Sequence, residues 1–324
     1  MSDAHLAMGG GAEFDLIRRL LDTWGARASG IGDDAAVITV PTGERLVVST
    51  DASVENIHFR REWMSPREIG ARAATAALSD LAAMGARPLG LLLALALPKS
   101  WEGDAEAIAD GVGATAAAVD CPIVGGNITR STELALTLTV LGCATRPVTR
   151  AGAREGDIIF VTGRLGGPGS ALAALLAGET PQSTALARFI APAARIQEGR
   201  WLAERRATAM IDISDGLLAD AGHLANASGV SLALDVPSIP CVAGIDAIAA
   251  LASGEEYELL VAIPPAVEID AAAFQNEFGI PLTRIGVSVP RGSKPVFVPA
   301  SCDDAAGHDH LSRSKSPATR DTGS

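Results

Sequence analysis

Aspartates stand at the ends of several apolar runs, and their placement is the most informative chemical feature of the sequence. A carboxylate at the end of a buried strand costs free energy unless a cation meets it. Oxygen ligands from separate segments, without a Cys/His cluster, suit a hard ion such as Mg²⁺, which usually shares its coordination sphere with substrate phosphates. The residues therefore predict a magnesium-dependent enzyme that handles phosphate. The aspartates are Asp33, Asp34, Asp51, Asp80, Asp212 and Asp215.

Other motifs narrow the chemistry or leave alternatives open. No Gly-x-x-x-x-Gly-Lys-Ser/Thr sequence is present, so the chain is not a P-loop enzyme. The glycine-rich segment 166–170 precedes a predicted helix, where it serves either as a plain turn or as an anion site. Asp215 suits a helix N-cap as well as a metal site. His58 is a lone histidine, a type that is more often structural than catalytic.

Composition limits the class of protein. The chain has 324 residues, a formal net charge of −12 and 48% hydrophobic residues. This acidity argues against nucleic-acid binding, which depends on Lys and Arg, but bound Mg²⁺ can still attract a small anion. Four cysteines without a Cys-x-x-Cys pair indicate free thiols in a reducing compartment. Without a signal-like start or an apolar run of membrane length, we expect a cytoplasmic protein with no membrane partner.

The patterns predict two α/β sandwich domains, each with a mixed sheet. We expect a flexible N-terminus (1–12), an N-terminal domain (13–150), a C-terminal domain (151–311) and a disordered tail (312–324). A capping box at Ser65–Glu68 predicts a helix over 65–84 that carries Asp80 near its end. Another helix is predicted to start at residue 13. The remaining predicted helices are 104–119, 170–177, 193–205 and 217–227. The predicted strands are 35–40, 46–50, 89–97, 122–124, 134–142, 158–162, 209–213, 231–236, 258–263, 283–288 and 295–298.

Taken in order, these segments resemble the thiamine-monophosphate kinase family of the aminoimidazole-ribonucleotide-synthetase-like (PurM-like) superfamily. Any one match is weak, but the ordered set spans about Glu13 to Leu311 and is specific. The matching motifs include Gly30-Ile31-Gly32-Asp33-Asp34, Ser49-Thr50-Asp51 with His58-Phe59, Leu78-Ser79-Asp80-Leu81, Val124-Gly125-Gly126-Asn127, Ile211-Asp212-Ile213-Ser214-Asp215-Gly216 and Gly254-Glu255-Glu256-Tyr257.

The resemblance implies a PurM-like fold and transfer of the ATP γ-phosphate to thiamine monophosphate, giving thiamine diphosphate and ADP. It also implies a homodimer whose N-terminal sheets pair across the two-fold axis. Catalysis would depend on Asp34, Asp51, Asp80 and Asp212. Gly126, Asn127, Arg150 and Ser214 would contact ATP, while His58 and Glu255 would contact the acceptor. Several Mg²⁺ ions would be held by Asp34, Ser49, Thr50, Asp51, Asp80, Asn127, Asp212 and Asp215.

Three departures from the family pattern leave other functions open. Asn127 stands where the family has aspartate, Glu256 where aspartate is usual, and Ala305 where an aromatic ring is common. One alternative is another ATP-using member of the superfamily, such as an aminoimidazole-ribonucleotide synthetase, a selenophosphate synthetase or a hydrogenase-maturation protein. The expected cysteines of the last two are missing. The remaining alternatives are a sensor that binds thiamine phosphate or nucleotide without turnover, and a structural metal-binding module.

Asn127 offers a carbonyl oxygen but no negative charge, so we expect one Mg²⁺ ion to bind more weakly than in typical members. Asn127→Asp should lower the Mg²⁺ concentration that gives half-maximal activity. The measurement is a Mg²⁺ titration of turnover for both proteins. An unchanged Mg²⁺ dependence would contradict the assignment of Asn127 as a ligand.

Overall fold

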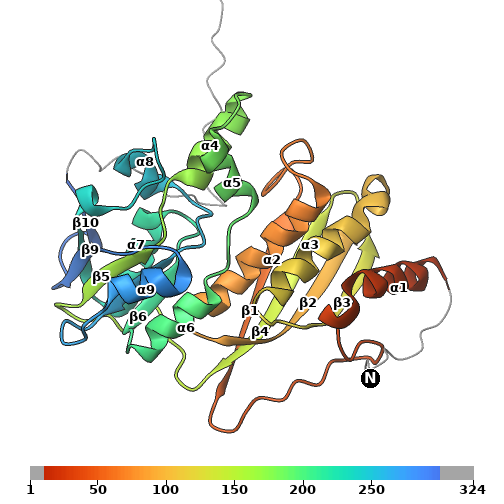
Figure 1. The fold of residues 1–324 in the computed structure, drawn as a ribbon, viewed down its shortest axis with the longest axis horizontal. Coiled ribbons are helices and arrows are strands. Elements are labelled where there is room, and N and C mark those ends of the chain that lie inside the picture. Colours follow the sequence, from red (N-terminus) through yellow and green to blue (C-terminus); the bar gives the residue numbers. More distant parts are fainter. Residues whose placement is uncertain (1–10, 300–324) are drawn as a thin grey trace, which may run out of the picture.

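The structure is a computed structural model that describes residues 11–299. The C-terminal segment with Ala305, the predicted tail 312–324 and most of the predicted flexible N-terminus lie outside these residues. Two sheets, one of four strands and one of six, form the centres of the two halves of the chain. In Figure 1 the four-stranded sheet lies to the right and the six-stranded sheet to the left.

The four-stranded sheet has the order β1-β4-β2-β3. Its strands are β1 (Arg45–Val54), β2 (Arg87–Leu97), β3 (Ile123–Arg130) and β4 (Ala135–Ala144). β2 and β3 are parallel, whereas β4 pairs antiparallel with both β1 and β2. Helices α2 (Pro66–Ala83) and α3 (Ala105–Ala117) lie side by side against the sheet, and α1 (Ala12–Trp24) packs on α3 (Figure 1). The sheet is mixed, as predicted.

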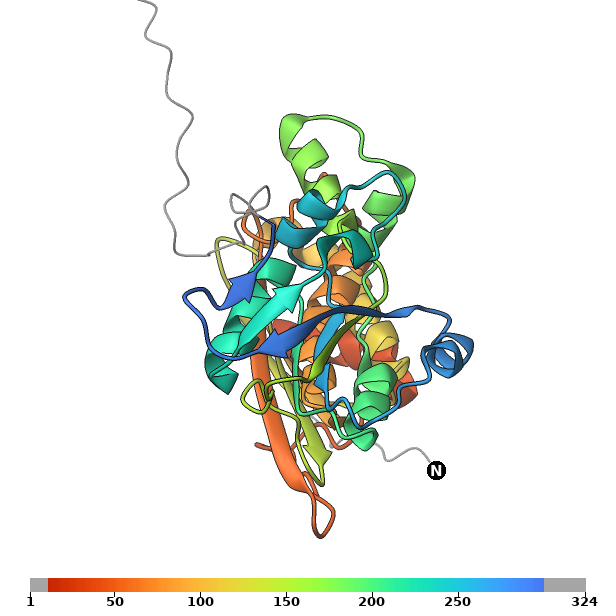
Figure 2. The same cartoon turned by 90° about the vertical axis from the view of Figure 1, so that its left-hand side faces the viewer.

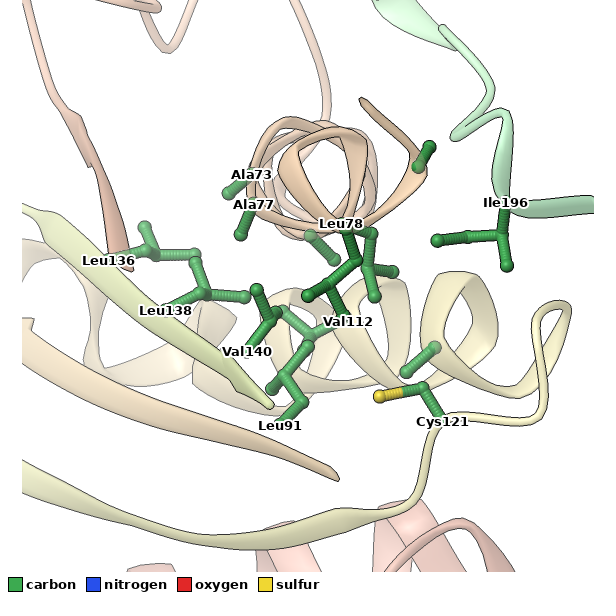
Figure 3. Packing of buried hydrophobic residues seen from close by; sticks show 14 of the residues in the cluster. Ala73, Ala77, Leu78, Leu91, Val112, Cys121, Leu136, Leu138, Val140 and Ile196 are labelled. Atoms are coloured by element: carbon green, nitrogen blue, oxygen red, sulfur yellow. The ribbon is translucent and has the colours of Figure 1, made fainter. Parts of the chain in front are cut away.

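Helix α2 begins at the predicted capping box. Ser65 accepts a hydrogen bond from the Glu68 backbone N–H, and the Glu68 carboxylate accepts one from the Ser65 backbone N–H. Ala73 and Ala77 of α2 face buried side chains of β4, and Leu78 points toward Val112 of α3 (Figure 3). Because most of these helical residues are alanines, the backbone of α2 can lie close to its neighbours.

The six-stranded sheet has the order β10-β7-β9-β5-β8-β6, with only β10 and β7 parallel. Helices α4 and α5 pack together at one end of the molecule in both views (Figures 1 and 2). Among residues 11–299, no helix is both long and apolar enough to cross a membrane. The strands are β5 (Ile158–Thr162), β6 (Ala209–Asp212), β7 (Ser231–Leu234), β8 (Leu259–Ile263), β9 (Leu282–Val289) and β10 (Val296–Phe297). The helices are α4 (Gly167–Ala177), α5 (Ser183–Ile190), α6 (Ile196–Glu204), α7 (Leu217–Ser228), α8 (Ala247–Ala252) and α9 (Ala271–Phe278), with short 3₁₀ turns at Gly25–Arg27, Lys99–Asp104 and Val236–Ser238.

The two halves share part of one hydrophobic core. Helix α2 contacts α6 and β6 as well as its own sheet, and Ile196 of α6 lies near α2 in Figure 3. A Cβ atom on Gly199 would lie 2.1 Å from the Ala82 carbonyl oxygen, so α6 approaches the end of α2 at backbone distance. The end of α2, where Asp80 lies, is therefore fixed against both halves. The division at residue 150 stays a prediction.

Three details differ from the sequence-based predictions. Residues 35–40 form no strand, although their apolar pattern predicted one; Val37 is 94% exposed, and no neighbouring strand pairs with this segment. β3 does not end before the glycines but continues through Gly125, Gly126 and Asn127 to Arg130, because β2 pairs along its whole length. The helices α5, α8 and α9 were not predicted, because with six to eight residues each they are too short to show a clear helical period.

The contact between α2 and α3 requires glycine at the crossing. A Cβ on Gly111 would lie 1.9 Å from the Arg67 carbonyl oxygen, whereas one on Gly222 of α7 would meet nothing closer than 4.0 Å. We expect Gly111→Ala to lower the free energy of unfolding by about 1–3 kcal/mol, because the helices must separate. Gly222→Ala is the matched control and should raise it by about 0.5–1 kcal/mol. Urea unfolding measures both, and an unchanged stability of Gly111→Ala would contradict the close contact.

Candidate functional site

A cavity of about 450 Å³ lies where the two halves meet. Its walls come from β1 and the turn that follows, the end of α2, one face of α4, the β6–α7 loop and the segment 252–257. One side of the cavity is lined by acidic side chains and another side by apolar ones. The acidic side chains are Asp51, Asp80, Asp212, Asp215 and Glu255, and the apolar ones include Ile57, Leu172 and Leu176.

The end of α2 joins β1 to β6 through two adjacent residues. Asp80 accepts a hydrogen bond from the Ser49 hydroxyl of β1. Ser79 donates from Oγ to Oδ2 of Asp212, at the end of β6, over 2.8 Å. Asp51 and Thr50 of β1 line the same cavity. The structure therefore brings together six of the eight predicted metal ligands, from β1, the end of α2, β6 and the loop after it: Ser49, Thr50, Asp51, Asp80, Asp212 and Asp215.

The electrostatics of this cluster favour a bound cation. Burial, and after it the nearby charge of Asp80, raise the pKa of Asp212 to about 6, while the Ser79 hydroxyl and the charge of Arg150 oppose the shift. Among the described residues, no Lys or Arg forms an ion pair with Asp80 or Asp212. The donors are carboxylate and hydroxyl oxygens, which suit Mg²⁺.

The loop before α7 is held by Asp220, which matches the family motif but to which no role was assigned from the sequence. The expected N-cap, Asp215, does not cap the helix; Gly216 occupies that position. Instead, Asp220 accepts hydrogen bonds from the backbone N–H groups of Ser214, Asp215 and Gly216 over 3.0–3.1 Å. This leaves the Asp215 side chain to line the cavity. Ligand atoms of Asp215, Asp220 and His223 lie within 4.8 Å of one another, so Asp215 has oxygen and nitrogen neighbours suited to a cation.

His58 and Glu255 lie on two tight turns that face the cavity. His58 Nδ1 accepts the Val54 backbone N–H over 3.1 Å, in the turn after β1. Glu255 and Tyr257 adopt left-handed backbone conformations, with φ of 59° and 51°. Their N–H groups donate to the carbonyl oxygens of Ser214 and Ile213 over 2.7 and 2.9 Å. Strained residues held by such contacts are common at binding sites.

The N-terminus of α4 is not an open anion site. Glu256 accepts the Gly166 backbone N–H over 2.5 Å, and the Ser253 hydroxyl over the same distance. The Gly169 N–H donates to Ser253 over 2.9 Å. Burial raises the pKa of Glu256 to about 7. The chain's own carboxylate therefore occupies this helix end, in agreement with the plain-turn interpretation.

Three predicted residues, Asp34, Gly126 and Asn127, line a different cavity of about 440 Å³ beside α1. The sheet register explains the separation. Asp51 pairs with Leu138, Leu138 with Leu93, and Leu93 with Gly126, so Asp51 and Gly126 lie in one row at opposite edges. Three strand spacings separate them by about 14 Å. Within a single chain, these residues do not reach the acidic cavity.

Comparisons with known proteins identify the family. The AIR synthase related protein family matches through its N-terminal domain at residues 32–144 and its C-terminal domain at residues 154–298. A thiamine-monophosphate kinase of Salmonella typhimurium is 37% identical over 92% of this chain and 98% of its own length.

The chain belongs to the thiamine-monophosphate kinase family.

Solved structures of the family superpose over nearly the whole chain. The crystal structure of thiamine-monophosphate kinase from Stenotrophomonas maltophilia K279a has a TM-score of 0.79 at 34% identity, and covers 92% of this chain and 98% of its own. AaThiL complexed with AMPPCP and TMP has a TM-score of 0.74 at 31% identity, covering 93% and 98%. The expected fold and family are thereby confirmed.

The buried carboxylates predict a pH-dependent effect of Mg²⁺ on stability. The pKa of Asp212 is raised from 3.8 to about 6 and that of Asp220 to about 7, so their protonated forms favour folding. That contribution is complete below the unfolded pKa and is lost as pH rises through 6–7. Mg²⁺ should therefore raise the melting temperature more at pH 7.5 than at pH 5.

Thermal unfolding with chelator or with Mg²⁺, at constant ionic strength, measures this difference. Asp212→Asn is the matched variant, because it removes one titrating ligand; its Mg²⁺-induced shift should be smaller and less dependent on pH. Equal Mg²⁺-induced shifts at the two pH values in the unmodified protein would contradict binding at these carboxylates.

Proposed function

We propose that this protein is a thiamine-monophosphate kinase, which transfers the γ-phosphate of ATP to thiamine monophosphate and releases thiamine diphosphate and ADP. The observation that carries the proposal is the cavity that joins Asp51, Asp80 and Asp212 to His58 and Glu255. A family member at 31% identity is complexed with AMPPCP and TMP, which supports the same two ligands here. A cytoplasmic location remains our expectation.

The cavity has the mixed character that the acceptor requires. Thiamine monophosphate combines aromatic rings with a phosphate group. Ile57, Leu172 and Leu176 give an apolar wall, and Ile57 and Leu176 are 68% and 59% exposed, which leaves them accessible to a ligand. His58 and the acidic cluster lie on the polar side. We assign the rings to the apolar wall and the phosphate to the polar side.

The chain's own residues serve to hold and orient the two phosphate groups. An ionised phosphate oxygen of the acceptor is already a nucleophile, so in-line transfer needs positioning and charge stabilisation rather than a strong base. Ser49, Asp51, Asp80 and Asp212 would hold Mg²⁺, which supplies the positive charge that offsets repulsion between the two anions. Ser214, which lines the cavity, and Arg150, whose charge acts on Asp212, would contact ATP.

A second copy of the chain completes the site in this proposal. Gly126 lies about 14 Å from Asp51 across the sheet, too far to share one ion within a chain, and Asn127 and Asp34 line the same cavity as Gly126. Both β1 and β3 are edge strands of that sheet. Leu46 and Val48 of β1 are about half exposed, at 49% and 54%. Pairing of two sheets across a two-fold axis would bury these side chains and bring one edge near the opposite edge of the partner.

The first test is formation of thiamine diphosphate from thiamine monophosphate, ATP and Mg²⁺, followed chromatographically. We expect product with the unmodified protein and at least a hundredfold less with Asp51→Asn, because a ligand charge is lost where phosphates meet. Absence of product despite ATP binding would overturn the kinase assignment and favour a sensor. Full activity of Asp51→Asn would show that this cavity is not the reaction site.

Co-expression of two inactive chains tests the shared site. Asp51→Asn and Asn127→Lys alter opposite edges of the sheet, and each should abolish activity alone. If each site combines one edge from each chain, every mixed pair has one intact site and one doubly altered site. About half of the pairs in a 1:1 mixture are mixed, so the mixture should recover about a quarter of full activity. No recovery in purified mixed dimers would contradict a site that is shared between chains.

A further inference from the structure

Arg72 lies buried beside the cavity, on the same face of α2 as Asp80. Its side chain is only 4% exposed. The spacing of eight residues is close to two helical turns and places it about 12 Å from Asp80 along the axis. Ala76, between them on this face, lines the cavity together with Asp80. No family motif noted in the sequence includes Arg72.

The guanidinium of Arg72 contacts three separate segments. Nη1 donates to the His58 carbonyl oxygen over 3.1 Å, and Nε donates to the Phe189 carbonyl oxygen over 3.0 Å. The Arg72 side chain also forms an ion pair with the Glu255 carboxylate. Its Cζ atom lies 4.6 Å from the centre of the Phe189 ring, on which it stacks. One buried cation thus connects both predicted acceptor-binding residues.

We infer that Arg72 is a positioning residue for the acceptor: it holds His58 and Glu255 in place from beneath the cavity. This inference rests on the proposed function, because it assigns those two residues to the acceptor. The planar guanidinium can donate in several fixed directions at once, which a lysine ammonium does not reproduce. Arg72 therefore sets the distance between two turns that belong to different halves of the chain.

Two features of Glu255 explain why it requires such a partner. Its φ of 59° is unfavourable for a residue with a side chain, so the surrounding contacts must hold it there. Its carboxylate also faces a cavity meant for phosphate, and an uncompensated negative charge would repel the acceptor. The ion pair with Arg72 offsets that charge and fixes the direction of the side chain.

A purely structural ion pair elsewhere in the chain provides the comparison. Arg195 donates to both carboxylate oxygens of Glu258 over 2.8 and 2.6 Å, and Glu258 is fully buried. Neither residue lines the acidic cavity. Loss of that ion pair should lower the stability of the protein without changing KM for one substrate more than KM for the other.

The test compares Arg72→Met, Arg72→Lys and Glu255→Gln, each alone, with Arg72→Met/Glu255→Gln and with Arg195→Lys as control. The readouts are melting temperature, kcat, and KM for thiamine monophosphate and for ATP. We expect Arg72→Met to raise KM for thiamine monophosphate at least about tenfold relative to KM for ATP, and Arg72→Lys to have a smaller effect. The double variant should be little worse than the worse single variant, because both changes remove one interaction. Arg195→Lys should lower only the melting temperature.

The outcomes separate this inference from the proposed function. If the unmodified enzyme forms no thiamine diphosphate, the proposed function fails. If it is active but Arg72→Met leaves the ratio of the two KM values within twofold while lowering the melting temperature, Arg72 is only structural and the inference is overturned. Additive effects of Arg72→Met and Glu255→Gln on KM for thiamine monophosphate would likewise overturn it.

Discussion

Helix α2 packs against both halves of the chain, and the geometry of the candidate site depends on that contact. Its Ser79 and Asp80 meet β6 and β1 through side-chain hydrogen bonds. Arg72, two turns earlier, contacts the turns that carry His58 and Glu255. The close approach of α3 at Gly111 and of α6 at Gly199 leaves little room for α2 to shift. A rigid helix therefore fixes the distances among groups that come from otherwise independent segments.

The site is electrostatically unfavourable without a bound cation. Asp80 lies near the buried side chain of Asp212. Asp220, which is also buried, is held nearby by hydrogen bonds from three backbone N–H groups. Such an arrangement is costly without a cation, because like charges and burial both oppose ionisation. It becomes favourable when metal and phosphates are present. The free energy that the clustered carboxylates cost in the empty site therefore favours binding of the metal and the phosphates.

The four-stranded sheet imposes a second constraint. Its register places Asp51 and Gly126 in one row but at opposite edges. Because the distance between paired strands is fixed, no side-chain rearrangement within one chain can bring the predicted ligands near Asp51 together with those near Gly126. A dimer of paired sheets would resolve this conflict and would also cover the exposed apolar residues of β1. The oligomeric arrangement and the chemistry are therefore linked in our proposal.

Short-range patterns in the sequence predicted the features that depend on neighbouring residues. The capping box at Ser65 and Glu68, the alternation of β4 and the order of the aspartate motifs predicted α2, most strands and the family. Local patterns did not predict that residues 35–40 lack a partner strand, or that Asp220 rather than Asp215 holds the loop before α7. Nor did they single out Arg72, whose partners lie 14 to 183 positions away. Only tertiary packing decided these points, because caps and periodicities involve a few adjacent residues, whereas the meeting of Ser79 with Asp212, 133 positions apart, depends on how whole elements pack.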